Sequence, residues 1–112
     1  MTDQRFDVQN RPEESRYVLI DTGSGEVIGE EDYVDVDKQR VLFHTGVSDD
    51  YSGQGLASLL VRAVVDDVIA QGYAIVPVCP YVAAWLPKHP EYAEHVVKPR
   101  PDHLRAVAAR EK

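Results

Sequence analysis

A short glycine-containing segment carries the residues best suited to bind a ligand. It follows an apolar stretch, Val41–Val47, and precedes a run of apolar residues at helical spacing. A helix that begins directly after such a loop has unpaired N–H groups at the positive end of its dipole, which suit a phosphate or pyrophosphate. The alternative is a glycine-rich turn that only leads into a helix, because short glycine motifs are weak evidence. The segment reads Ser52-Gly53-Gln54-Gly55-Leu56-Ala57.

His44, inside the same apolar stretch, could act as a general base. An imidazole exchanges protons near neutral pH, which is what proton abstraction from an amine requires. By the period-two alternation of a strand, we expect His44 on the same face as Leu42 and Gly46. The alternative is a half-buried strand histidine bonded to backbone.

The elements that must position these residues follow from the apolar pattern. The first third of the chain predicts an antiparallel meander, and a helix that ends at Gly72 follows it. We therefore expect one α/β (α+β) domain over residues 1–112, with its core at about 5–95, a short helical tail and a frayed end at residues 1–4. The expected strands are Arg5–Val8, Arg16–Asp21, Glu26–Val36, Val41–Val47 and Ala74–Val78, and the expected helices are Gly55–Gln71, Tyr81–Leu86 and part of Pro99–Arg110.

Composition excludes several classes of protein. The 112 residues fit one domain, and a formal net charge of -7 disfavours binding to nucleic acid. One cysteine permits no internal disulfide, and the histidines lack metal-ligand spacing, so we expect no metal. No apolar run approaches the ~18 residues of a membrane span, and we expect a cytoplasmic protein without a membrane partner. The acidic residues expected to form a solvated face are Glu30, Glu31, Asp32, Asp35 and Asp37.

Four motifs in order resemble a small stand-alone subfamily of the GCN5-related N-acetyltransferases. The glycine loop resembles the family's pyrophosphate loop, commonly Q/R-x-x-G-x-G/A, although Ser52 stands where Gln or Arg is usual. Gly46 likewise departs from a position that is often acidic in the subfamily. The motifs are His44-Thr45, Gly53-Gln54-Gly55-Leu56-Ala57, Pro77-Val78-Cys79-Pro80-Tyr81-Val82 and His89-Pro90-Glu91-Tyr92.

The resemblance implies a mixed, mostly antiparallel sheet in which two adjacent parallel strands splay apart around acetyl-CoA. By analogy these strands are Val41–Val47 and Ala74–Val78, joined by a βαβ crossover. It implies that the pantetheine arm pairs with the first of them and that backbone amides at the loop hold the pyrophosphate. The implied cofactor-binding residues are Thr45, Val47, Ser52, Gly53, Gln54, Gly55, Leu56, Ala57 and Ser58.

Two further side chains are implied near the acetyl group. Cys79 could carry an acyl group, protonate the leaving thiolate, or be a small buried residue. Tyr81 could protonate the CoA sulfur by analogy with tyrosines of the superfamily, or fill a sheet edge.

A Pro-bounded segment near the C-terminus carries three aromatic residues, Trp85, His89 and Tyr92. We expect them to pack the C-terminal part of the fold rather than line the acceptor pocket.

The function these features favour is direct transfer of acetyl from acetyl-CoA to a primary amine of a small molecule or protein, with His44, Cys79 and Tyr81 as catalytic candidates. One alternative is a non-catalytic module that binds or senses acyl-CoA. Another is an interaction protein that keeps only the fold. The chain is short for an acceptor-recognition domain, so a homodimer could complete the site.

Overall fold

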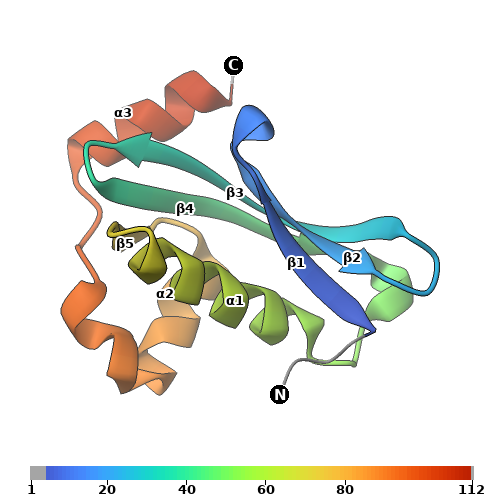
Figure 1. The fold of residues 1–112 in the computed structure, drawn as a ribbon. Coiled ribbons are helices and arrows are strands. Elements are labelled where there is room, and N and C mark those ends of the chain that lie inside the picture. The colour runs from blue at the N-terminus through green and yellow to red at the C-terminus, as the bar shows by residue number, and fades with distance from the viewer. Residues whose placement is uncertain (1–4, 112) are drawn as a thin grey trace.

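One five-stranded sheet forms the centre of the molecule (Figure 1). The computed structural model describes residues 5–111, and the predicted frayed end at 1–4 lies outside the described residues. Neighbouring strands are antiparallel except for the last two, which are parallel, so the predicted mixed, mostly antiparallel sheet is confirmed. In spatial order the strands are β1 (Phe6–Arg11), β2 (Arg16–Asp21), β3 (Glu26–Val36), β4 (Gln39–Val47) and β5 (Ala74–Pro77).

In the part of the chain that the structure describes, three α-helices and several short 3₁₀ turns accompany the sheet. Helix α1 (Leu56–Ala70) connects the parallel strands β4 and β5, which is the predicted βαβ unit. Within residues 5–111, no helix has both the length and the apolar character needed to cross a bilayer. The remaining elements are α2 (Pro80–Trp85), α3 (Pro101–Arg110) and the 3₁₀ turns Pro12–Glu14, Asp49–Tyr51, Leu86–Lys88 and Pro90–His95.

Helix α1 forms because its apolar residues recur on one face and its ends carry glycine. Gly72, just past the last turn, has φ +82°, a conformation that favours glycine over any residue with a Cβ. The predicted bounds of this helix are within one residue of the observed ones. Its buried residues are Leu56, Leu60, Val61, Val64, Val65 and Val68.

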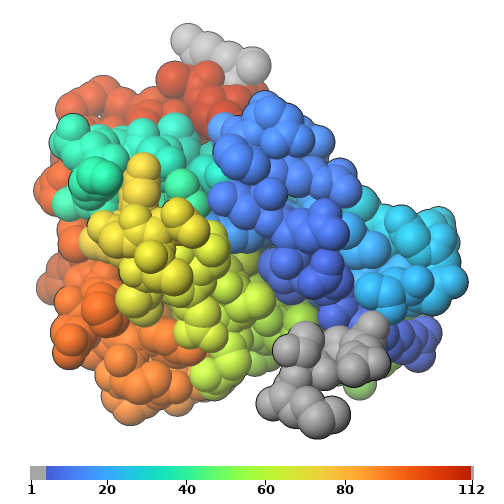
Figure 2. All heavy atoms as spheres, viewed as in Figure 1, coloured from blue at the N-terminus to red at the C-terminus, as the bar shows by residue number. Residues whose placement is uncertain are grey.

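Apolar clusters are buried on both faces of the sheet. Helices α1 and α2 cover a large apolar core on the first face, which includes Leu42 and Tyr33. Helix α3 covers a smaller cluster on the second face, built on Val41, Val76 and Val107. Figure 2 shows α1, in green to yellow, between the blue N-terminal strands and the orange C-terminal turns, with α3 in red above them.

Truncating the centre of α1 should destabilise the fold. Leu60 is 0% exposed in the larger core, so Leu60→Ala removes buried methyl groups and leaves a cavity. We expect the free energy of unfolding in urea to fall by ~3 kcal/mol. Leu104→Ala on α3 is the matched control, because that side chain is 51% exposed and its loss should change stability little. Equal losses in the two variants would contradict the assigned core.

A β-bulge in β4 corrects the predicted faces of that strand. The register passes from Asp32↔His44 to Tyr33↔Leu42, so Phe43 is an extra residue without its own partner on β3. Leu42 therefore points into the core under α1, whereas Phe43 packs on the α3 side. The prediction that His44 shares a face with Leu42 is wrong, because simple alternation cannot anticipate an inserted residue.

The predicted solvated acidic face is also wrong in part. Glu31 is 0% exposed and Asp32 is 9% exposed. The reason is that β3 is an interior strand, paired with β2 on one side and β4 on the other. Arg16 donates from Nε to Asp32 Oδ1 at 2.7 Å, which pairs that carboxylate. Among the described residues, Glu31 has no cationic partner of this kind.

Candidate functional site

The parallel strands β4 and β5 run together for only four residue pairs. The last registered pair is Leu42↔Pro77. Beyond it, the N–H groups of Val78 and Cys79 both donate to the Leu42 carbonyl, at 3.0 and 2.9 Å, and the chain then turns away into α2. In the described part of the chain, residues 44–47 of β4 therefore have a registered strand neighbour only on the β3 side. This is the predicted splay.

The glycine loop leads from β4 into an uncapped helix. Gly53 and Gly55 have φ of +80° and +70°, so both positions favour glycine. Gly55 is the N-cap residue of α1, and no side chain caps the helix. The amides of the first turn, at Leu56, Ala57 and Ser58, have no acceptor within the helix. A cavity beside this loop makes them available to a ligand.

The cavity has a volume of about 260 Å³ and joins the loop to the start of α2. It collects most of the predicted cofactor-binding residues and one predicted catalytic residue, Tyr81. Thr45 and Gln54, also predicted, are not among its lining residues. Its lining residues are Val47, Ser48, Tyr51, Ser52, Gly53, Gly55, Leu56, Ala57, Ser58 and Tyr81.

Tyr51 is a cavity residue that sequence reasoning missed. Its hydroxyl donates to Asp21 Oδ2 at 2.6 Å, and its ring meets Phe6 edge to face. The hydrogen bond to Tyr51 holds the pKa of Asp21 below its usual range. These two contacts of Tyr51 hold the loop against β1 and β2. They are long-range contacts, which a local sequence motif does not predict.

Cys79 lies at the other end of the splay, as the N-cap residue of α2, and is 4% exposed. Its Sγ is 3.1 Å from Thr45 Oγ1 on β4. Thr45 in turn donates a short hydrogen bond to Oε1 of Glu31 on β3. These three side chains form a connected polar group beneath the helices, and only Glu31 was missing from the residues predicted to act there.

Burial raises the pKa of Glu31 to about 8, and the nearby carboxylates of Asp32 and Glu30 add to the rise, while the hydrogen bond from Thr45 opposes it. Among the described residues, Glu31 Oε2 is a buried polar atom without a hydrogen-bond partner. The run of acidic residues in β3 gave no sign of this, because burial of this position depends on the helices that pack on the sheet.

The raised pKa of Glu31 predicts a pH dependence of stability. Below pH 4.5, the ordinary value, both the folded and unfolded chains hold the proton, and the contribution of Glu31 is intact. As pH rises toward about 8, the unfolded chain releases the proton while the folded chain keeps it, so stability falls. The wild-type free energy of unfolding should fall by an amount on the order of 4 kcal/mol between these limits. Glu31→Gln cannot titrate, so the variant should lack this fall when both are measured by urea unfolding.

The control for this measurement is Glu13→Gln, which changes an exposed carboxylate. Its unfolding free energy should follow the same pH curve as the wild-type protein. If Glu31→Gln also follows that curve, the burial of an uncompensated carboxyl group is contradicted.

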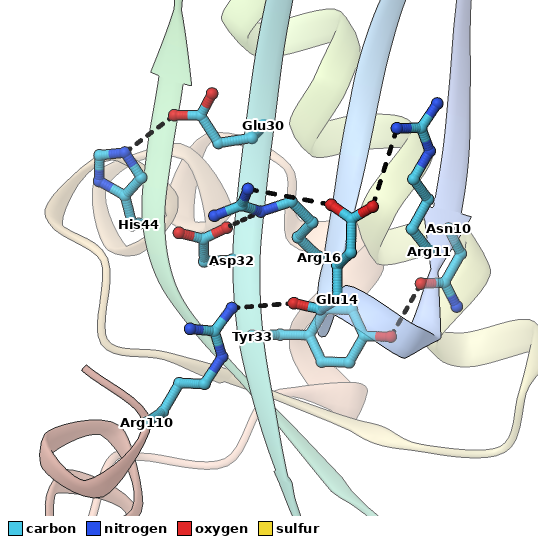
Figure 3. Close-up of polar contacts among 9 residues, drawn as sticks. All are labelled: Asn10, Arg11, Glu14, Arg16, Glu30, Asp32, Tyr33, His44 and Arg110. Carbon is cyan, nitrogen blue, oxygen red and sulfur yellow. Dashed lines mark hydrogen bonds and ion pairs between the residues drawn. The ribbon is translucent and has the colours of Figure 1, made fainter. Parts of the chain in front are cut away.

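His44 lies on the second face of the sheet with its side chain 53% exposed. Figure 3 shows it beside Glu30, whose Oε2 is 3.0 Å from His44 Nε2. A Cβ at position 46 would collide with Glu30 Oε2 and lie 3.2 Å from His44 Nε2. Glu30 thus occupies the space that a side chain at Gly46 would need, and a carboxylate reaches His44 from the neighbouring strand.

The aromatic segment after α2 is packed as expected. Trp85 is 5% exposed, donates from Nε1 to Ser58 Oγ at 2.8 Å and stacks on His89 at 3.6 Å between ring centroids. The Tyr92 hydroxyl donates to Asp66 at 2.7 Å. These contacts hold the C-terminal turns against α1.

Over residues 5–111, no group of three or more His, Cys, Asp or Glu side chains could hold a metal ion.

The candidate site consists of strand β4, the glycine loop and the uncapped start of α1, beside the splay of β4 and β5. The model of the GCN5-related N-acetyltransferase family matches residues 16–96, and the chain belongs to that family. No curated protein matches the chain.

Several solved structures resemble the chain. A GCN5-like protein from Staphylococcus aureus, solved by NMR, has a TM-score of 0.63 at 24% identity, over 90% of this chain and 97% of that one. The ribosomal-protein-S18-alanine N-acetyltransferase of Escherichia coli gives 0.49 at 21% identity, over 66% of this chain and 42% of that one. The first likeness confirms the predicted fold.

Proposed function

We propose that this protein transfers the acetyl group of acetyl-CoA to a primary amine, by direct attack in a ternary complex. The observation that carries the proposal is the uncapped first turn of α1 beside the cavity at the splay of β4 and β5. Amides of that turn hold the pyrophosphate. The pantetheine arm lies along β4 beyond Leu42, where β5 no longer pairs.

The cofactor and the amine approach from opposite faces of the sheet. The cavity lies on the side of α1, whereas His44 is exposed on the second face. The amine enters from that second face through the splay, and His44 accepts its proton as nitrogen attacks the thioester carbonyl. Glu30, bonded to His44, orients the imidazole and stabilises its protonated form.

The CoA sulfur leaves toward the side of α2. Tyr81 lines the cavity and is 40% exposed, so its hydroxyl is available to protonate the leaving thiolate. Cys79, beside Thr45 at the end of the splay, lies next to the reacting thioester. The half-buried carboxylate of Glu30 favours a cationic acceptor at the second face, which an amine supplies before it loses its proton.

The test is a screen of primary amines and peptide N-termini with acetyl-CoA, read as release of free CoA and as acetylated product by mass. The proposal expects at least one amine to be acetylated at a rate above the background without protein. Stable binding of acetyl-CoA with no transfer to any amine would favour a module that binds acyl-CoA. Absence of both would leave a protein that shares only the fold.

A further inference from the structure

Glu31 is buried in a way that the fold does not require. It is 0% exposed, Oε1 accepts a hydrogen bond from Thr45, and Oε2 has no partner among the described residues. Burying a carboxyl group without full hydrogen bonding is unfavourable, and an apolar side chain of similar size would serve the packing better. A role at the neighbouring thiol of Cys79 would explain why a carboxyl group occupies this buried position.

When Glu31 is ionised, the hydrogen bonds from Cys79 to Glu31 have a fixed direction. The Thr45 hydroxyl has one proton, and it donates that proton to Glu31 Oε1. In its 3.1 Å contact with Cys79, the Thr45 oxygen therefore accepts, and the thiol donates. The chain of donors runs from the sulfur through the hydroxyl to the carboxyl group.

The charges around Glu31 favour proton uptake. Glu30 and Asp32 flank it on β3, and both oppose a negative charge at its position. On β2 its registered partner is Tyr17, whose hydroxyl donates to Asp67 of α1 and accepts from Arg40. Across residues 5–111, no hydrogen bond or ion pair joins Glu31 to a cation. At this position the protonated, neutral carboxyl group is therefore favoured over the carboxylate.

We propose that Glu31 is the proton acceptor for the thiol of Cys79, acting through the hydroxyl of Thr45. The relay starts from the ionised form of Glu31: when the S–H bond breaks, its proton passes to Thr45 Oγ1, and the Thr45 proton passes to Glu31 Oε1. The products are a thiolate, an intact hydroxyl and a neutral carboxyl group, with no net gain or loss of protons. Glu31 is a positioning residue; the use of the sulfur in catalysis rests on the proposed function.

The test is NMR titration without acetyl-CoA, following the ¹³Cβ signal of labelled cysteine and the ¹³Cδ signals of labelled glutamate. Cys79 is the only cysteine, so its signal is unique. In the wild-type protein we expect the Cys79 and Glu31 signals to change together at one shared inflection. Thr45→Ser, which keeps the hydroxyl, should retain it. Thr45→Val should uncouple the two signals, and Glu31→Gln should remove the shared inflection from Cys79.

An identical Cys79 titration in wild-type protein, Thr45→Val and Glu31→Gln would overturn the relay. Retention of the shared inflection in Thr45→Val alone would also overturn it, since only a field effect would remain. If Glu31→Gln fails to fold, the comparison of Thr45→Ser with Thr45→Val still tests the relay. Glu13→Gln is the control for general charge effects. Because no cofactor is present, failure of acetyl-CoA binding would leave this result unchanged.

Discussion

Gly55→Asp should abolish acetyl-CoA binding in a protein that still folds. Gly55 caps α1 with φ +70°, and an added Cβ would meet no atom within 4 Å. The new carboxylate would therefore enter the open space beside the first-turn amides, where it would repel the pyrophosphate and compete for its donors. We expect binding to weaken at least a hundredfold, or about 2.8 kcal/mol, in a calorimetric titration.

The matched control is Gly55→Asn, which has nearly the same shape without the charge. Asn and Asp both tolerate the left-handed conformation, so the two variants should lose similar stability, about 1 kcal/mol. Asn should retain much more affinity than Asp. Unchanged affinity in Gly55→Asp, at full folding, would contradict the assignment of this loop to the pyrophosphate.

His44→Ala should reduce turnover by a factor on the order of 10² to 10³ while leaving acetyl-CoA affinity unchanged. The reason is that His44 lies on the second face of the sheet, away from the cavity that would hold the cofactor. The measurement is the steady-state rate of acetylation of the best amine from the screen, with acetyl-CoA affinity measured separately.

Two variants accompany His44→Ala. Glu30→Gln removes the carboxylate bonded to His44 and should lower turnover less than loss of the imidazole itself. His95→Ala removes a histidine of the 3₁₀ turn Pro90–His95 and should leave turnover unchanged. Full activity in His44→Ala would contradict the role of His44 as general base. It would leave the fold and the role of the glycine loop unaffected.

Much of the fold could be predicted because its signals are local. The apolar spacing of α1, the glycine after it and the continuous apolar run of β2 are each encoded within a short stretch of sequence. The family resemblance supplied the pairing of β4 with β5, which lie on either side of a helix and share no local signal. The cavity at the glycine loop followed from the same resemblance.

The features that could not be predicted depend on contacts between strands. The bulge at Phe43 shifts the register of β4 against β3, so the face of His44 was assigned wrongly relative to Leu42. Burial of Glu31 results from its interior strand and the covering helices, although its neighbours in sequence are charged. Glu30 reaches the space above Gly46 from another strand, which a missing side chain at 46 does not reveal.

The most direct test of the central claim is calorimetric titration of acetyl-CoA and of CoA into the purified protein, with Gly55→Asp alongside. The account predicts micromolar binding of both ligands to the wild-type protein, because the loop amides contact the pyrophosphate that both contain. It predicts loss of both in the variant. No binding at millimolar ligand would contradict the account and leave a domain that has the acetyltransferase fold without its cofactor site.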